Sequence, residues 1–286
     1  MCRGIHIFIG KIHEASICRG APKVSNLLFA DDSLLFCRAT QNEVEVISKV
    51  LQTYANALGQ CINLEKSSVF FSSNTSASQK QDILWVLGVQ EVNQFDSYLG
   101  EPTLVGRAKY HMFSYLKGRI WKKLQGWKGK MLSRAGKEIL IKAVAQSIPT
   151  YTMSVFQLPL KLCDELDAMC AKFWWGQVGD EQKIHWQRWE KLTRSKKDEI
   201  IDFRDLRAFN FSMLAKQGWR LLHDDNYLVY KCLKARYFPR THLFDAKESS
   251  NCSFVWKSIV AALPILKLGC CWRVGNGLSN RVSGDK

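Results

Sequence analysis

The spacing of apolar residues changes near residues 102–106, and this change limits the folds that the chain can adopt. Upstream, short runs of strand-forming residues at 5–9, 27–36 and 68–72 surround a segment, residues 43–58, whose apolar side chains recur every three or four positions. Downstream, helical spacing dominates. The pattern predicts an α+β unit, made of a hairpin, a helix and a returning strand, followed by a mostly α-helical region.

Individual helices follow from these patterns. The helix over residues 43–58 should end at Gly59, because glycine readily adopts the left-handed conformation of a helix C-cap. Three apolar stripes predict further helices: Phe113, Leu116, Ile120, Leu124 and Trp127; Ile139, Leu140, Ala143 and Val144, which Pro149 closes; and Leu162, Leu166, Met169 and Phe173. Four tryptophans further along are interpreted as packing aromatics: Trp174, Trp175, Trp186 and Trp189.

Composition sets the broad class of the protein. With 286 residues and 47% hydrophobic content, the chain can form one large or two modest globular domains. Its ten cysteines include no Cys-x-x-Cys spacing, and the sequence shows no secretory leader, so we expect reduced thiols in an intracellular protein. The longest apolar run near the end, residues 259–266, is short and contains Pro264, which argues against a membrane span.

The positive charge of the chain is concentrated in one window. The formal net charge is +15, and residues 107–142 contain eleven basic residues against one acid, Glu138. The basic residues are Arg107, Lys109, Lys117, Arg119, Lys122, Lys123, Lys128, Lys130, Arg134, Lys137 and Lys142. Such a run can be a solvated helix face, but faces of that kind normally mix both signs to avoid self-repulsion. We therefore predict contacts with nucleic-acid phosphates, with Tyr110 and Trp121 interleaved for base stacking.

A second candidate site lies in the stretch NLLFADDSLLF, residues 26–36, where Asp31 and Asp32 separate two apolar runs. Asp-Asp-Ser is good turn chemistry, so the stretch predicts a β-hairpin with both carboxylates at its tip. The pair can be an ordinary solvated turn. It can also be a metal site, because adjacent carboxylates repel one another unless a cation lies between them, and Mg²⁺ prefers one or two carboxylates, waters and substrate phosphates.

Six segments of the chain occur in a characteristic order. They are RGAPKVSNLLFADDSLLF (residues 19–36), GQCINLEKSSVFFSSN (59–74), YLGEPTLVGRAK (98–109), GWKGKMLSRAGKEILIKAVAQSIPTYTMSVFQLP (126–159), FWWG (173–176) and WRVGNG (272–277). Together they resemble the reverse transcriptase of plant LINE-type, non-LTR retrotransposons. The resemblance implies the C-terminal part of a polymerase palm over residues 1–102, a basic helical thumb over 103–185, and a helical, aromatic-rich region over 186–286 that leads towards a zinc-binding tail.

The resemblance also implies roles for individual residues. Asp31 and Asp32 match an aromatic-x-Asp-Asp tip, whose first aspartate binds the catalytic Mg²⁺ (or Mn²⁺) and whose second supports the site. Lys66 falls where such polymerases place a lysine that protonates the leaving pyrophosphate; taken by itself, it is a solvated strand-edge lysine. Tyr98, Leu99 and Gly100 would lie near the primer end. The implied partners are an RNA template and a DNA primer, or an RNA/DNA hybrid, and the implied location is the nucleus.

Two features depart from the family pattern. Glu199-Ile200-Ile201-Asp202 replaces a glycine-rich loop, and residues 1–30 contain no aspartate and only Glu14 as an acid, although a palm needs a further metal-binding aspartate on an earlier strand. We therefore expect a fragment with an incomplete metal site, inactive as a polymerase by itself unless an upstream fragment completes it in trans. Two alternatives stay open: a non-catalytic nucleic-acid-binding remnant, and a protein similar to organellar intron maturases.

Overall fold

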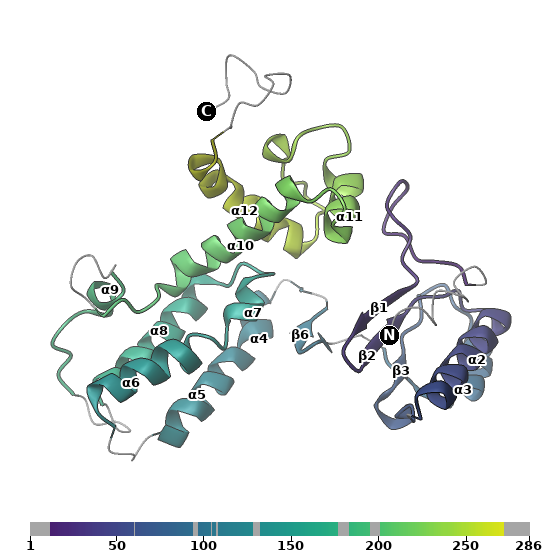
Figure 1. The fold of residues 1–286 in the computed structure, drawn as a ribbon, viewed down its shortest axis with the longest axis horizontal. Coiled ribbons are helices and arrows are strands. Elements are labelled where there is room, and N and C mark those ends of the chain that lie inside the picture. The colour runs from purple at the N-terminus through teal and green to yellow at the C-terminus, as the bar shows by residue number, and fades with distance from the viewer. Residues whose placement is uncertain are drawn as a thin grey trace. The chain divides into compact units, whose positions relative to one another are not determined.

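In the computed structural model, the protein is a mixed helical molecule with a few short strands, 56% helix and 7% strand, which is compatible with the expected α+β class (Figure 1). The structure describes residues 12–59, 61–93, 97–103, 105–106, 108–127, 132–176, 183–194 and 201–271. The strand predicted at residues 5–9 lies outside these ranges. The chain divides into two compact units: Met1–Leu104 with Lys231–Arg236, and Val105–Tyr230 with Tyr237–Lys286.

The first unit contains the predicted hairpin. Strand β1 (Asn26–Phe29) pairs antiparallel with β2 (Asp32–Leu35), and Phe29 lies opposite Asp32. The turn between the two strands is Ala30-Asp31, so both carboxylates lie at the tip as the sequence predicts. A second, shorter hairpin consists of β5 (Ser97–Tyr98) and β6 (Glu101–Pro102).

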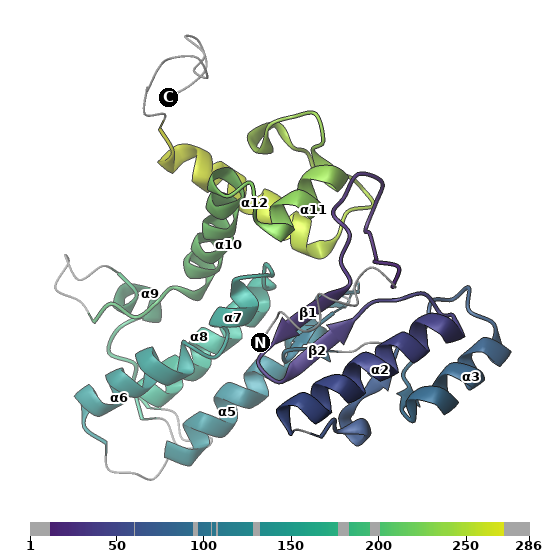
Figure 2. The same cartoon turned by 45° about the vertical axis from the view of Figure 1, so that its right-hand side comes forward.

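Two helices support these strands. Helix α2 (Gln41–Leu58) ends at Gly59, whose φ of 63° is left-handed and whose N–H donates to the carbonyl of Ala55, as predicted. It lies beside α3 (Ala77–Leu87) in both ribbon views (Figures 1 and 2). Among the described residues of this unit, Val44, Phe71 and Ile83 form one buried cluster, and Ile47 and Val50 of α2 are buried as well.

One buried carboxylate joins the segments around α2. Glu43 is 6% exposed, and its side chain accepts hydrogen bonds from the backbone N–H groups of His13 (3.1 Å) and Arg38 (2.9 Å) and pairs with the His13 ring (2.5 Å). Burial acts to raise the pKa of Glu43, but these hydrogen bonds outweigh it and lower the pKa. The start of α2 is therefore fixed to the chain on both sides of the β1–β2 hairpin.

The returning strand differs from the prediction. Strand β3 (Ser68–Val69) has two residues rather than five, and it pairs in parallel with β4 (Gln90–Glu91). Helix α3 lies between these two strands in the sequence, and the sequence analysis did not predict it. Lys66 belongs to a short 3₁₀ helix, Leu64–Lys66, and not to a strand. A parallel pair needs a crossover connection, which α3 provides.

The second unit is helical. Its helices are α4 (Lys109–Phe113), α5 (Tyr115–Trp127), α6 (Arg134–Leu140), α7 (Thr150–Met153), α8 (Leu160–Trp174), α9 (Trp189–Leu192), α10 (Leu206–His223) and α12 (Phe254–Gly269). Helix α11 (Leu228–Tyr237) belongs partly to each unit, and a 3₁₀ helix covers Leu243–Asp245. Within the described ranges, none of the helices combines the length and the apolar character that crossing a membrane requires.

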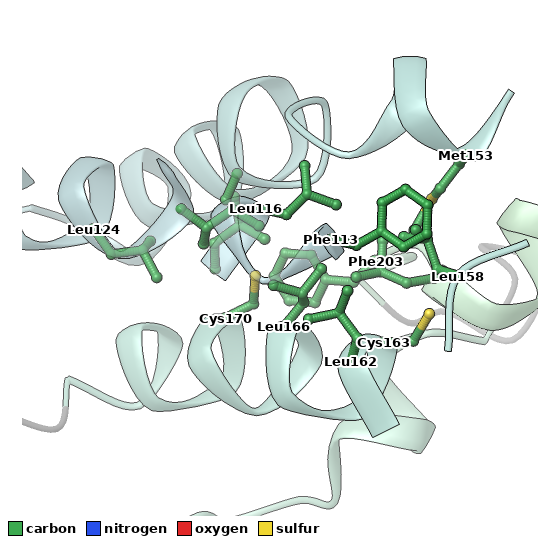
Figure 3. Packing of buried hydrophobic residues seen from close by; sticks show 14 of the residues in the cluster. Phe113, Leu116, Leu124, Met153, Leu158, Leu162, Cys163, Leu166, Cys170 and Phe203 are labelled. Carbon is green, nitrogen blue, oxygen red and sulfur yellow. The ribbon is translucent and has the colours of Figure 1, made fainter. Parts of the chain in front are cut away.

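The core of the second unit confirms two of the three predicted stripes. Phe113, Leu116, Ile120 and Leu124 are buried and face α8, which contributes Leu162 and Leu166 (Figure 3). Met169, Phe173 and Trp127 pack at the edge of the same cluster.

The helix predicted from residues 139–144 is present as α6 and the turn after it, but the face expected to be buried was wrong in part. Ile139 is 64% exposed and Ala143 is exposed, whereas Ile141 and Ala145 are buried. A π-helical turn at Ile141–Ala145 continues α6 with wider hydrogen-bond spacing and shifts the side chains that follow it; Ile139 precedes this turn, and its exposure has no such explanation.

Buried amides connect the helices of this unit. Asn210 of α10 is 3% exposed; it accepts from the N–H of Leu158 (2.8 Å) and donates to the carbonyls of Met153 and Phe156 (2.9 Å each). Gln146 is fully buried and exchanges two hydrogen bonds with the backbone of Arg204 (3.0 and 3.2 Å). Because each amide satisfies backbone groups that lack secondary-structure partners, α10 is fixed against the α7–α8 connection.

Candidate nucleic-acid interface

The aspartate tip is exposed and conformationally strained. Asp31 and Asp32 are both exposed, and Ala30 before them has a φ of 50°, in the left-handed region that residues with a Cβ rarely adopt. Phe29, which precedes the turn, is 60% exposed. In the described part of the chain, no group of three or more His, Cys, Asp or Glu side chains could hold a metal ion. The tip thus offers two adjacent carboxylates, a donor type that Mg²⁺ accepts, without a third described protein ligand.

The other two features that the resemblance assigns to the palm, Lys66 and residues 98–100, lie in the same unit. Lys66 is exposed, and its backbone N–H donates to the Asn63 side chain (3.1 Å); among the described residues, no hydrogen bond or ion pair joins Lys66 to either aspartate. Leu99 and Gly100 form the turn of the β5–β6 hairpin, with φ of 53° and 79°. Two left-handed residues in a two-residue hairpin turn are typical of type I′, which glycine accepts easily and leucine does not.

Eight of the eleven basic residues lie in the described ranges, and the structure separates them into three groups; Arg107, Lys128 and Lys130 lie outside. Two lysines have carboxylate partners. Lys117 pairs with Glu165 (2.5 Å), and Lys142 pairs with Glu138 (2.6 Å) and also donates to the carbonyl of Ile201. Hydrogen bonds from Lys117 and Tyr110 lower the pKa of Glu165. The hydrogen bonds of Lys117 with Glu165 and with the Tyr110 hydroxyl raise the pKa of Lys117.

Four more cations lie over aromatic rings. Their distances to the ring centroids are 4.1 Å for Lys109 over Phe254, 4.9 Å for Arg119 over Tyr115, 5.4 Å for Arg134 over Trp175 and 5.9 Å for Lys137 over Phe173. These distances suit cation–π attraction, so the four side chains help to cover the aromatic surface of the unit.

The third group is Lys122 and Lys123 on α5. Both side chains are exposed, and neither has a counter-ion or hydrogen-bond partner among the described residues. Trp121 beside them is 56% exposed, whereas Trp127 packs against Phe173 with 5.8 Å between ring centroids. The outer face of α5 therefore presents two uncompensated charges and one accessible indole, which is the combination that phosphate and base contacts use.

The tryptophan cluster is only in part the packing group that the sequence predicted. Trp174 is 5% exposed, and Trp189 stacks on Phe203 at 4.7 Å. Trp186, however, is 75% exposed, and it lines an open hollow of about 420 Å³ together with Arg134, Trp174 and Trp175. We call this site the tryptophan hollow. In the sequence, the signal for this hollow is the three tryptophans Trp174, Trp175 and Trp186 close together, with the basic residue Arg134 upstream.

Residues 199–202, which replace the glycine-rich loop of the family pattern, belong to the second unit. Glu199 and Ile200 lie outside the described ranges, but Asp202 has a φ of 62°, and the Phe203 that follows is buried at 1% exposure. A glycine would adopt this φ without strain, and aspartate is among the few other residues that tolerate it. Asp202 is therefore a left-handed residue at the end of a segment that contains no glycine.

One carboxyl group and two thiols on α8 have strongly shifted pKa values. Burial raises the pKa of Asp167 to about 7, and the thiols of Cys163 and Cys170 have pKa values raised to about 12, mainly by burial and then by Asp167 nearby. At neutral pH both thiols are protonated, so they are poor nucleophiles and poor metal ligands. Cys163 and Cys170 are each 1% exposed, so both thiols are part of the packing of α8.

Comparison with known proteins gives two relatives. No protein-family model matches the chain. The chain is 35% identical over 141 residues to an uncharacterized mitochondrial protein of Arabidopsis thaliana, a match that covers 49% of this chain and 92% of that protein. It is 30% identical over 192 residues to another Arabidopsis thaliana protein, named "Putative ribonuclease H protein", and this match covers 65% of this chain and 30% of that protein.

Proposed function

The chain belongs to the family of that uncharacterized mitochondrial protein, and from this premise we propose that it is a retrotransposon-derived protein that binds nucleic acid through its basic helices. The observation that carries the proposal is the outer face of α5. Lys122 and Lys123 are exposed there without a described counter-ion, in a chain whose formal net charge is +15. Polyanion binding would relieve this repulsion and release counter-ions from the phosphates.

The finer form of the proposal concerns a reverse transcriptase. In this form, the β1–β2 hairpin is the Asp-Asp tip of a palm, and helices α4 to α8 are a thumb that holds an RNA/DNA hybrid. The choice of hybrid rests on the resemblance to reverse transcriptases, and the name of the second relative, "Putative ribonuclease H protein", is in keeping with a nucleic-acid partner. The match covers only 30% of that relative. We therefore use its name only to support a nucleic-acid partner, and we do not propose ribonuclease H activity for this chain.

Binding of an RNA/DNA hybrid tests the proposal. Fluorescence anisotropy with a labelled hybrid should give a dissociation constant that changes little between unrelated sequences, because phosphate contacts carry no sequence information. The double variant Lys122→Glu/Lys123→Glu should bind about tenfold more weakly or worse. The matched control is Lys216→Glu/Arg220→Glu, which makes the same charge change on exposed positions of α10. Equal losses in both variants would contradict a site on α5.

The strained hairpin favours a second, compatible function. We propose that Asp31 and Asp32 bind Mg²⁺ or Mn²⁺ weakly, with a dissociation constant on the order of millimolar, because water must supply most of the ligands. When bound, the cation would neutralise phosphate charge in nucleotidyl transfer. Mn²⁺ should broaden the amide signals of residues 29–33, and Asp31→Asn should reduce the broadening. Equal broadening in the variant would mean a solvated turn.

Primer extension provides the catalytic test. The described residues hold two of the carboxylates that in-line phosphoryl transfer needs, and Lys66 has no described contact with them. We therefore expect no extension of a labelled primer by this chain with Mg²⁺ or Mn²⁺. Extension that is restored by an added fingers-palm fragment, and lost again in Asp31→Asn, would support a divided polymerase. Extension by the chain without an added fragment would show that its own residues complete the site.

A further inference from the structure

The tryptophan hollow is an open depression whose lining residues are not used by the proposed binding on α5. It is open, has a volume of about 420 Å³, and has walls from α6, the end of α8 and the segment 183–194. This volume lies within the range of pockets that hold small ligands. Trp186 is 75% exposed, and within the described ranges its ring has no aromatic neighbour, so one indole face is accessible.

Cations gather beside the hollow. The guanidinium of Arg134 lies 5.6 Å from the Trp174 ring and 5.4 Å from the Trp175 ring. The Lys137 ammonium lies close to Gly176, since a Cβ built there would be 3.2 Å from it. Burial, and then the charges of Arg134 and Lys183, lower the pKa of Lys137. Three cations therefore repel one another at this place, and an anion would relieve the repulsion.

Indole donors next to the hollow lack partners. The Nε1 atoms of Trp174 and Trp175 are buried and have no hydrogen-bond partner in the described part of the chain. Because both atoms are buried, a ligand in the open hollow does not reach them, and they are not counted among its donors. The hollow thus combines an accessible aromatic face with positive charge.

We propose that the tryptophan hollow binds one unpaired nucleotide of a single-stranded nucleic acid, with the base against Trp186 and the phosphate beside Arg134 and Lys137. The inference rests on the proposed nucleic-acid binding and adds the strandedness of the ligand. An aromatic anion uses both the indole face and the positive charge, whereas an acidic peptide without an aromatic side chain would leave the indole face unused. A paired base is already stacked between its neighbours in a duplex, so only an unpaired base can lie against Trp186.

The test compares one sequence in two forms. A fluorescein-labelled single strand of about 12 nucleotides, within the site size of single-strand binding modules, is measured beside the same sequence as a duplex. Trp186→Ala should weaken binding of the single strand by about tenfold and leave the duplex unchanged, and Trp186→Phe should restore most of the loss. The matched control is Trp85→Ala, which removes an indole that is 89% exposed on α3 of the other unit. Equal effects of Trp186→Ala on both forms, or no effect on the single strand, would overturn the proposal.

The outcomes separate this inference from the function on α5. If Lys122→Glu/Lys123→Glu weakens both forms and Trp186→Ala weakens neither, the α5 site stands and the hollow does not bind nucleotides. If the wild-type chain binds no oligonucleotide, a purine nucleoside monophosphate tests the hollow by itself. It should quench the tryptophan fluorescence of the wild type more than that of Trp186→Phe. Equal quenching in the two proteins, or none, would overturn the inference.

Discussion

The buried carboxyl of Asp167 should make the second unit less stable as the pH rises. One of its oxygens, Oδ1, is buried without a hydrogen-bond partner in the described residues, and burial raises its pKa from 3.8 to about 7. The acids Asp164 and Asp205 raise it further, while the Trp189 indole and the charge of Arg207 act in the opposite direction. The folded protein therefore holds a proton that the unfolded chain releases.

The sign and size of the effect follow from proton linkage. Between pH 4 and 7 the folded state binds more protons than the unfolded state, so the stabilisation is complete below pH 4 and is lost as the pH rises through about 7. A shift of this size corresponds to roughly 4 kcal/mol at most, since one pKa unit is about 1.4 kcal/mol. Asp167→Asn keeps the shape of the side chain but does not ionise. At pH 8 the variant should be more stable than the wild type by roughly 2–4 kcal/mol, and near pH 4 the two should be similar.

Urea unfolding of both proteins at intervals from pH 4 to 8 measures this difference. Other carboxylates with shifted pKa values, such as Glu165, contribute equally to both curves and cancel in the difference.

The control is Asp164→Asn on the same helix. The carboxylate of Asp164 is exposed and forms an ion pair with Arg207. This substitution should cost at most about 1 kcal/mol at pH 8. Parallel pH curves for the wild type and Asp167→Asn would refute the argument, because they would mean that Asp167 is ionised in the folded state across the whole range.

Three further substitutions test a buried hydrogen-bond network, a close helix contact and a strained turn. Asn210→Ala should lower the free energy of unfolding by about 3 kcal/mol, because it leaves three buried backbone groups unpaired, and a loss below about 1 kcal/mol in urea unfolding would contradict this role. Gly218→Val should cost about 1–3 kcal/mol by the same measurement, since even a Cβ there would be 3.1 Å from Leu266 of α12; an unchanged stability would mean that α10 and α12 separate easily. Ala30→Gly should slow hydrogen exchange in the β1–β2 hairpin by relieving about 0.5–1 kcal/mol of strain, and faster exchange would argue against a left-handed residue at 30.

Local patterns predicted the elements that depend on short-range sequence. The hairpin at residues 26–36, the end of α2 at Gly59 and the buried face of α5 all follow from turn chemistry and apolar spacing. Helix α3 was missed because Ile83 is the one residue of this helix that is fully buried, although its capping box of Ser76 and Gln79 was a usable signal. The stripe at residues 139–144 predicted the helix but not its buried face: a π-helical turn, which apolar spacing does not reveal, shifts the side chains from residue 141 on.

The site depended more on tertiary contacts. The sequence predicted one uniform basic stripe, but Lys117 and Lys142 are paired with carboxylates, and Glu165, the partner of Lys117, lies on another helix. Which lysines remain uncompensated is therefore a property of the packing. For the same reason the sequence could not separate Trp186, which is exposed, from Trp174, which is buried. The ring contacts of Arg134 likewise become visible only when α6 and α8 are placed together.

The salt dependence of RNA/DNA hybrid binding tests the central claim most directly. If the outer face of α5 binds phosphates, the affinity of the wild-type chain should fall linearly on a plot of log K against log salt concentration. In the variant Lys122→Glu/Lys123→Glu the slope should be smaller in magnitude by about two, one for each lost phosphate contact. A variant with the slope of the wild type would contradict the claim that these two lysines hold the nucleic acid.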